Sequence, residues 1–164
     1  MHDNPILPLV RNPYKMLKAV GLKKGQKVLE VGCGPGFFTI PAARIVGDEG
    51  RVYAVDIHPR AIARVKEKIE KEALKNLMPM CSNASNTGLQ GGSVDLAFLF
   101  GLRYFAGGLE NVISELHRVL KPGGIISFEK TRGSEGELIE EIERGGFTYT
   151  RKKGRIFLFT KKGE

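Results

Sequence analysis

The sequence has no tryptophan, only two cysteines and only three histidines among its 164 residues. Neither Cys33 nor Cys81 has a CxxC or Cys–His spacing, so no metal site is expected. Both fall within or beside expected strands, and we expect each to be a small buried thiol. Of the histidines, His58 precedes a helix start and is expected at the surface, whereas His117 is expected to pack on a helix face.

Long apolar runs are also missing. Stretches such as residues 95–102 are far shorter than the ~20 residues that a membrane-spanning helix needs. Residues 1–13 lack the basic segment, apolar core and cleavage site of a secretion signal. We therefore expect a cytoplasmic protein with no membrane partner. The length predicts one domain over residues 1–164.

Acidic residues are fewer than basic ones: the chain has 18 Asp and Glu and 26 Lys and Arg, which gives a formal net charge of +8. Such a balance permits RNA or another polyanion as a partner but does not establish one. The basic residues are spread along the chain and gather near its end, at 151–155 and 161–162. This distribution favours a solvated surface over a polyanion site.

Glycine, by contrast, is concentrated at one informative place. The apolar run 27–31 predicts a strand, and Gly32, Gly34 and Gly36 follow it at alternate positions. Glycine adopts positive φ at little cost, and it lets a ligand lie against the backbone. The dinucleotide fingerprint GxGxxG requires a third glycine where this chain has Phe37. The loop therefore predicts a bound nucleoside cofactor that is not a dinucleotide.

An acidic residue closes the next strand. Residues 52–55 are apolar, Asp56 follows them, and it stands 20 positions after Gly36. Ligands of open parallel sheets bind at the carboxyl ends of strands, where an acid at this distance accepts hydrogen bonds from ribose hydroxyls. A carboxylate there also repels a ribose 2′-phosphate. Cys33, inside the loop, is expected to pack beneath the turn rather than act as a nucleophile.

Strands and helices alternate along the chain. The apolar periodicity predicts strands at 27–31, 52–55, 77–81, 94–100, 125–129, 147–150 and 155–161, and helices at 13–20, 60–74, 109–120 and 135–144. Such alternation predicts a doubly wound α/β fold with a mostly parallel sheet, and the closing hairpin makes the last strand antiparallel. We expect residues 1–20 to form an N-terminal lid, with Asn12 capping its helix.

The motifs together resemble those of class I S-adenosylmethionine-dependent methyltransferases over essentially the whole chain. The segments that carry the resemblance are VLEVGCGPGFFT, VYAVDIHP, SVDLAFLF and HRVLKPGGIISFE. Among subfamilies, the chain looks most like the ubiquinone/menaquinone C-methyltransferase group (methyltransferase type 11). The resemblance implies a Rossmann-like, seven-stranded sheet with an antiparallel C-terminal strand, and S-adenosyl-L-methionine as the cofactor.

The same resemblance assigns roles to residues. The glycines face the methionyl part of the cofactor, Glu30 lies near its ammonium group, Asp56 holds the ribose and Ile57 packs on the adenine. Asn83 and Ala84 occupy a position where the family usually has an acid, so Asn83 departs from the pattern. The implied cofactor-binding residues are Glu30, Gly32, Cys33, Gly34, Gly36, Asp56, Ile57, Asn83, Ala84 and Phe100.

The methyl acceptor is expected above the end of strand 94–100. Enzymes that methylate the amines of DNA bases carry two prolines and an aromatic residue there, whereas this chain reads FLFGLRYF, so that substrate class is disfavoured. Arg103 and Tyr104 are candidates for binding or polarising an acceptor. A small-molecule acceptor is expected. An RNA or protein substrate, and a cofactor-binding subunit without activity, remain alternatives.

Overall fold

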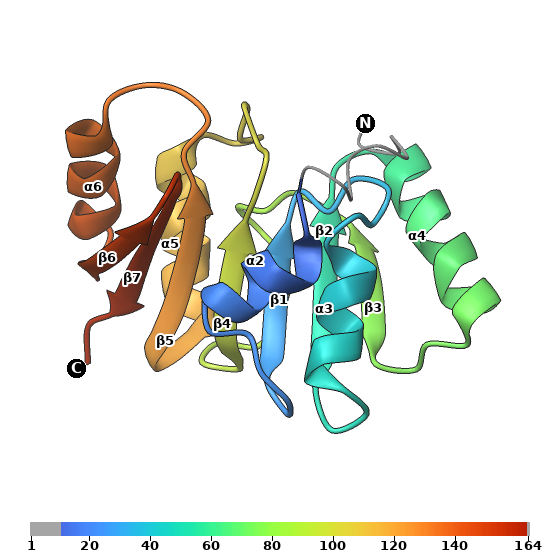
Figure 1. Cartoon of the computed structure of the whole chain (residues 1–164). Coiled ribbons are helices and arrows are strands. Elements are labelled where there is room, and N and C mark those ends of the chain that lie inside the picture. The colour runs from blue at the N-terminus through green and yellow to red at the C-terminus, as the bar shows by residue number, and fades with distance from the viewer. Residues whose placement is uncertain (1–10, 164) are drawn as a thin grey trace.

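The computed structural model describes residues 11–163, which build a seven-stranded sheet with helices on both faces (Figure 1). The strands run in the order β3-β2-β1-β4-β5-β7-β6. Their bounds are Lys27–Val31 (β1), Arg51–Asp56 (β2), Leu77–Cys81 (β3), Val94–Leu99 (β4), Leu120–Glu129 (β5), Phe147–Lys153 (β6) and Ile156–Lys161 (β7).

The strand order has its switch point between β1 and β4, because the chain proceeds from β1 to β2 and β3 on one side and then returns to β4 on the other. These strands and β5 pair in parallel, whereas β7 is antiparallel to both β5 and β6. The predicted doubly wound fold with an antiparallel last strand is confirmed. Ligands of such sheets bind at the carboxyl ends beside the switch point.

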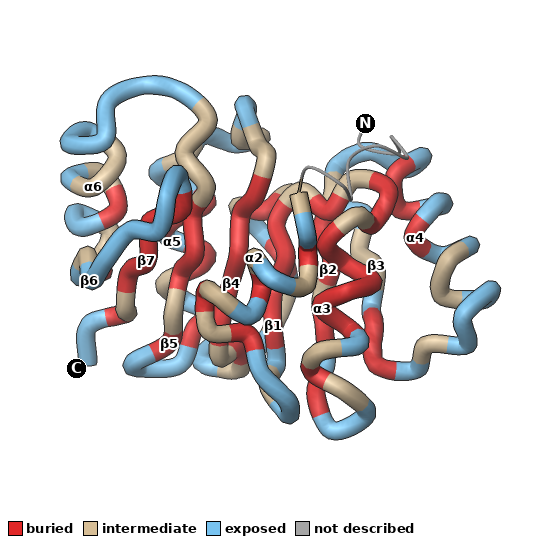
Figure 2. The backbone as a smooth tube through the Cα atoms, in the orientation of Figure 1, coloured by how far each residue is buried: buried red, intermediate tan, exposed pale blue. Residues whose placement is uncertain are grey.

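Helices cover the two faces of the sheet and divide the core into two clusters. The helices are Pro13–Ala19 (α2), Thr39–Val46 (α3), Pro59–Glu72 (α4), Leu109–Val119 (α5) and Glu135–Arg144 (α6). Residues of α2, α3 and α4 pack on one face, and those of α5 and α6 pack on the other. Both faces of the central strands are therefore buried, as their unbroken apolar runs require (Figure 2).

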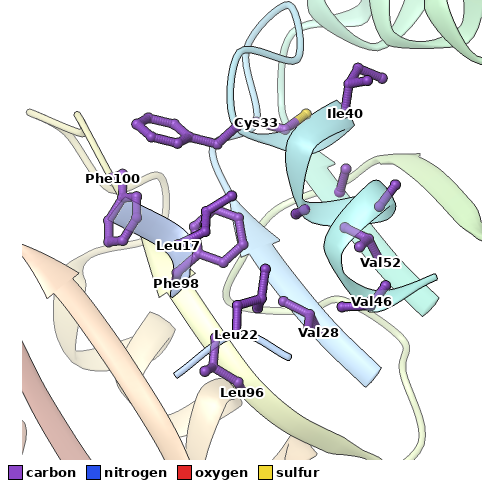
Figure 3. Packing of buried hydrophobic residues seen from close by; sticks show 14 of the residues in the cluster. Leu17, Leu22, Val28, Cys33, Ile40, Val46, Val52, Leu96, Phe98 and Phe100 are labelled. Atoms are coloured by element: carbon purple, nitrogen blue, oxygen red, sulfur yellow. The ribbon is translucent and has the colours of Figure 1, made fainter. Parts of the chain in front are cut away.

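Phe38, Phe98 and Phe100 pack together in the first cluster, and Figure 3 shows Phe98 and Phe100 side by side. Phe98 on β4 is fully buried, and its ring centroid lies 5.1 Å from that of Phe100 and 6.4 Å from that of Phe38. Phe38 directly precedes α3, at the end of the glycine loop. The aromatic group therefore ties the loop to the central strand beneath it.

Most element boundaries lie within two residues of the predicted ones, but β5 begins earlier. The helix before it ends at Val119, as the Pro-Gly-Gly segment predicted, yet Leu120 already pairs with Val94. An irregularity between Val94 and Leu96 absorbs the change of register. Residues 121–124, which lie between the predicted helix and the predicted strand, thus belong to β5.

The prediction of two buried thiols is half right. Cys33 is buried, whereas Cys81 is exposed. Cys81 ends β3, an edge strand with a neighbour on one side only, so its side chain is poorly covered. The expected packing role of His117 is confirmed, because its ring meets Phe147 edge-on at 5.5 Å. His58 is exposed, as predicted.

The helix predicted to form part of a lid lies on the sheet. Asn12 caps it by accepting a hydrogen bond from the Lys15 amide at 3.1 Å, and Leu17 is buried in the core beside the residues of α3. Residues 1–10, the rest of the predicted lid, lie outside the described part. Between residues 11 and 163, no helix is long and apolar enough to cross a membrane.

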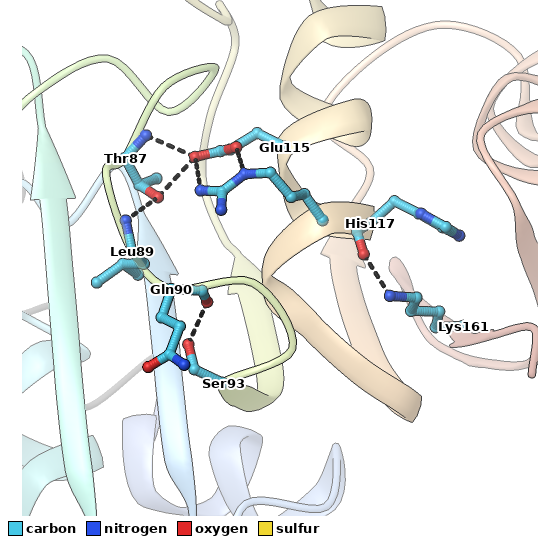
Figure 4. A network of polar contacts seen from close by, with 8 residues as sticks. Thr87, Leu89, Gln90, Ser93, Glu115, His117 and Lys161 are labelled. Carbon is cyan, nitrogen blue, oxygen red and sulfur yellow. Dashed lines mark hydrogen bonds and ion pairs between the residues drawn. The ribbon is translucent and has the colours of Figure 1, made fainter.

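A polar network fixes the loop between β3 and β4 (Figure 4). The buried Glu115 carboxylate of α5 accepts hydrogen bonds from the Thr87 amide and hydroxyl, each at 2.7 Å, and forms an ion pair with Arg118. Burial opposes ionisation of Glu115, but the bonds from Arg118 and Thr87 outweigh it and lower its pKa. At the end of α5, Lys161 donates to the His117 and Leu120 carbonyls at 2.6 and 2.8 Å.

Candidate functional site

A cavity of about 410 Å³ opens at the carboxyl ends of β1, β2, β3 and β4. This volume falls in the range of ~300 to 1,000 Å³ that is typical of small-molecule sites. Four predicted cofactor residues and both candidate acceptor residues line it. The lining residues are Val31, Gly32, Val55, Asp56, Ile57, His58, Ser82, Ala84, Gly101, Leu102, Arg103, Tyr104, Phe105 and Ala106.

The glycine loop needs its glycines for different reasons. All have positive φ: 73° at Gly32, 54° at Gly34 and 100° at Gly36. A Cβ at Gly32 would lie 2.2 Å from Cδ2 of Leu102, which covers this glycine, whereas a Cβ at Gly34 would meet nothing within 4 Å. A Cβ at Gly36 would lie 3.5 Å from Val65 of α4. Gly34 therefore presents open backbone, whereas at Gly36 a Cβ would find ordinary contacts and the positive φ is what favours glycine.

Asp56 joins the end of β2 to the glycine loop. Its Oδ2 atom accepts a hydrogen bond from the Gly34 amide, and its Oδ1 atom accepts one from the His58 amide, both at 2.9 Å. A carboxylate offers about four acceptor positions, so each oxygen keeps one for a further donor. The carboxylate is thus held in place at the cavity with capacity to bind two hydroxyl groups.

The walls beside Asp56 are mostly apolar. Ile57 is 42% exposed, which is unusual for a branched apolar side chain, and it lines the cavity with Ala84. Asn83 does not line it, because its Oδ1 atom accepts hydrogen bonds from the Ser85 amide and hydroxyl at 2.9 and 2.8 Å. The Ser82 hydroxyl is buried and has no hydrogen-bond partner within residues 11–163. Apolar surface thus lies beside one unsatisfied polar group.

Two further predicted residues lie behind the loop rather than on the cavity. Glu30 is buried and accepts a hydrogen bond from the Thr39 hydroxyl. Its pKa is raised to about 8 because burial disfavours the carboxylate, and the Asp56 charge adds to the effect, while the Thr39 bond opposes it. Burial likewise raises the pKa of the Cys33 thiol. A protonated, buried thiol is a poor nucleophile, in agreement with the packing role expected for Cys33.

The raised pKa of Glu30 predicts a dependence of stability on pH. The pKa of Glu30 in the unfolded chain is the ordinary 4.5, whereas in the folded protein it is about 8. The free energy of unfolding therefore falls as pH rises between these values, by up to ~1.4 kcal/mol per pH unit from this group. Glu30→Gln keeps an acceptor for Thr39 without the charge, so we expect urea unfolding of this variant to lose that decline. Equal pH profiles for the two proteins would contradict the assignment.

Phe100 supports the cavity from beneath. Its ring is buried and packs 5.1 Å from that of Phe38, so it does not line the cavity. Tyr104 is 72% exposed at the mouth of the cavity.

The sequence analysis did not predict Ser82 and Phe105 as lining residues. Ser82 directly follows β3, the same strand-end position that singled out Asp56, and that signal was sufficient to find it.

The wall formed by residues 101–106 is tethered to the end of β5. Glu129 accepts a hydrogen bond from the Gly101 amide at 2.7 Å. Nη2 of Arg11 donates to both oxygens of the same carboxylate, at 3.0 and 2.8 Å, and the Arg11 guanidinium lies 5.3 Å from the Phe38 ring centroid. Arg11 therefore links the glycine loop, β5 and the wall.

Comparison with known proteins agrees with this geometry. Residues 28–124 match a family described as "Methyltransferase domain". Demethylmenaquinone methyltransferase of Geobacillus stearothermophilus is 34% identical over 111 residues, which are 67% of this chain and 47% of that protein. Its namesake in Staphylococcus aureus (strain MRSA252) is 33% identical over 113 residues, 68% of this chain and 46% of the relative. The chain thus spans about half the length of these relatives.

A solved structure covers nearly the whole chain. The crystal structure of a SAM-dependent methyltransferase from Aquifex aeolicus superposes with a TM-score of 0.82 at 29% identity, over 96% of this chain and 92% of that one. Residues 28–124, which match the family, include the glycine loop, Asp56 and the strands on both sides of the switch point, β1 and β4. By sequence and by fold, the chain belongs to the methyltransferase-domain family.

Proposed function

We propose that this chain is an S-adenosylmethionine-dependent methyltransferase that acts on a small molecule. The observation that carries the proposal is the position of Asp56, which is held at the cavity by the Gly34 and His58 amides with acceptor capacity to spare. Membership of the methyltransferase-domain family supports it. The predicted absence of a dinucleotide follows from Phe37, which stands where a third glycine is required.

The chemistry of the cavity fits S-adenosylmethionine. Asp56 would accept the ribose hydroxyls, Ile57 and Ala84 would pack on the adenine, and the open backbone at Gly34 would face the methionyl part. The resemblance places the ammonium group near Glu30, whose buried carboxyl lies behind the loop, and the positive charge would favour the carboxylate form of Glu30. The bound cofactor supplies an electrophilic methyl on a sulfonium, which an acceptor takes by displacement to leave S-adenosylhomocysteine. The chain then mainly positions the two reactants.

The wall opposite Asp56 supports a small-molecule acceptor. Leu102 and Phe105 present apolar surface there, and the exposed Arg103 and Tyr104 lie where they would orient an acceptor. Named relatives include demethylmenaquinone methyltransferases, so the family includes proteins named for a small-molecule acceptor. We infer the same class of acceptor for this chain.

An RNA substrate is the second candidate, and the net charge of +8 favours it. One group of basic residues, Lys18, Lys23, Lys24 and Arg44, surrounds a hollow formed by α2, α3 and the segment that leads into β1. That segment enters the amino end of β1, whereas the cavity lies at the carboxyl ends. RNA bound at this hollow would therefore lie away from the cavity.

Labelled methyl transfer tests the proposal. The chain is incubated with S-adenosylmethionine carrying an isotopically labelled methyl group and a cell extract, and the extract is then separated into small-molecule, RNA and protein fractions. We expect label in the small-molecule fraction with the unaltered chain and with Asp48→Ala, an exposed acid far from the cavity, and much less label with Asp56→Ala at a limiting cofactor concentration. Label confined to RNA or protein would overturn the acceptor class, and no label in any fraction would overturn the activity.

A further inference from the structure

A second, smaller cavity lies on the other side of the 101–106 wall. It has a volume of about 210 Å³ and opens between this wall, the end of β5 and α6, near the tall β5–α6 connection in Figure 1. Its floor is apolar: Phe105, Leu109, Phe128 and Leu138 line it, and the Phe105 and Phe128 rings lie 5.5 Å apart. Such a floor suits an aromatic or aliphatic group.

Cations surround this apolar floor. Arg103, Lys130 and Arg132 all line the cavity. Arg132 donates to the Arg103 carbonyl at 2.8 Å, whereas the side chains of Arg103 and Lys130 form no hydrogen bond or ion pair within residues 11–163. Lys130 is also half-buried.

Glu110 and Glu137, next in sequence to the lining residues Leu109 and Leu138, form no ion pair with these cations within residues 11–163, and the two acids that flank residues 130–132 are bound elsewhere. The carboxylate of Glu129 is bound by Arg11, and that of Glu135 is bound by Lys152 at 3.1 Å. The half-buried ammonium of Lys130 thus has no anionic partner among the described residues, and its charge is available to a ligand. The rim of the second cavity therefore has the electrostatic character of an anion site.

The two cavities share a wall. Leu102, Arg103 and Phe105 line both of them. The wall is fixed to the end of β5, because the Thr131 hydroxyl donates to the Leu102 carbonyl at 2.7 Å and Glu129 accepts from the Gly101 amide at the same distance. A ligand anchored in the second cavity would therefore lie next to the cofactor cavity, with only the fixed wall of residues 101–106 between them.

We propose that the second cavity binds one end of the methyl acceptor, and that this acceptor has an apolar body and an anionic group, a carboxylate or a phosphate. At about 210 Å³ the cavity is smaller than the ~300 Å³ at which sites for whole drug-sized ligands begin, so it holds a fragment of the acceptor. The apolar part packs on Phe105 and Phe128, and Lys130 and Arg103 bind the anion. This inference rests on the proposed function for its link to methyl transfer, but the binding site stands on its own contacts.

Binding of small probes tests the site. The probes are 3-phenylpropionate, phenyl phosphate and the uncharged 3-phenylpropanamide, titrated by NMR into the whole chain with and without S-adenosylhomocysteine. We expect one or both anions to bind and the amide to bind at least about fivefold more weakly, since even partly exposed charge pairs reach this ratio. Lys130→Met should remove the preference for the anions while it keeps the apolar stem. Lys24→Ala, which removes an equal charge at a distant hollow, should leave the preference unchanged.

Equal binding of amide and anions, no binding of either anion, or an equal loss in Lys24→Ala would overturn the site. Thermal unfolding of Lys130→Met checks that the variant folds. Arg103→Gln removes the other cation that is proposed to bind the anion, and it repeats the test independently. S-adenosylhomocysteine is titrated into the same samples. Failure of the unaltered chain to bind it would overturn the proposed function, whereas the anion preference is measured independently of that result.

Discussion

Replacing Asp56 with alanine is expected to weaken the binding of S-adenosylhomocysteine by about 10- to 150-fold. This range corresponds to ~1.5 to 3 kcal/mol, the contribution of hydrogen bonds to a charged group. The loss has two sources, because the carboxylate would hold the ribose and already holds the Gly34 and His58 amides in place. Calorimetric titration of the variant and of Asp48→Ala, the exposed control, measures the change.

A deoxyribose analogue separates these two sources. The unaltered chain should bind the 2′-deoxy analogue of S-adenosylhomocysteine more weakly than the parent ligand, whereas Asp56→Ala should bind both alike, because the contact is already lost. An equal penalty for the analogue in both proteins would show that Asp56 does not touch the ribose. An unchanged affinity of Asp56→Ala for the parent ligand would remove Asp56 from the cofactor site altogether.

Truncating Phe98 is expected to produce the largest loss of stability. Its side chain is fully buried on the central strand β4, where it packs against the rings of Phe38 and Phe100. Phe→Ala substitutions at such positions cost about 3 to 5 kcal/mol, because apolar burial is lost and a cavity remains. We expect Phe98→Ala to lower the free energy of unfolding in urea by this amount.

Tyr104→Ala provides the matched aromatic control. Tyr104 is 72% exposed, and exposed side chains away from special contacts change stability by about 0.5 kcal/mol or less. The comparison separates burial from aromatic character, because both changes remove a six-membered ring. A loss below about 1.5 kcal/mol for Phe98→Ala would show that the central cluster relaxes around the vacancy.

Local patterns in the sequence were sufficient to predict most of the fold. The strand at 27–31 and the helix at 135–144 have the predicted bounds, because apolar periodicity and flanking glycines are local signals. Leu120 joins β5 only because Val94 lies opposite it, and the exposure of Cys81 follows from the edge position of β3. Both depend on the order of strands in the finished sheet, which no single segment encodes.

The sequence likewise predicted part of the candidate site. The strand end pointed to Asp56, and the resemblance to the methyltransferase family added Ile57 and Ala84; all three line the cavity. Glu30, Cys33 and Gly36 share the same motif but do not line the cavity, because Glu30 bonds to Thr39, Cys33 packs in the core and Gly36 lies beside α4. The ion pair between Arg11 and Glu129 joins residues 118 positions apart, and no sequence spacing predicts it.

Crystals of the chain grown with S-adenosylhomocysteine give the most direct test of the central claim. The account predicts that both ribose hydroxyls lie within hydrogen-bonding distance of the Asp56 carboxylate, with the adenine between Ile57 and Ala84 and the amino-acid part along Gly34. A ligand bound elsewhere in the molecule, or no ligand in the cavity at a saturating concentration, would contradict it.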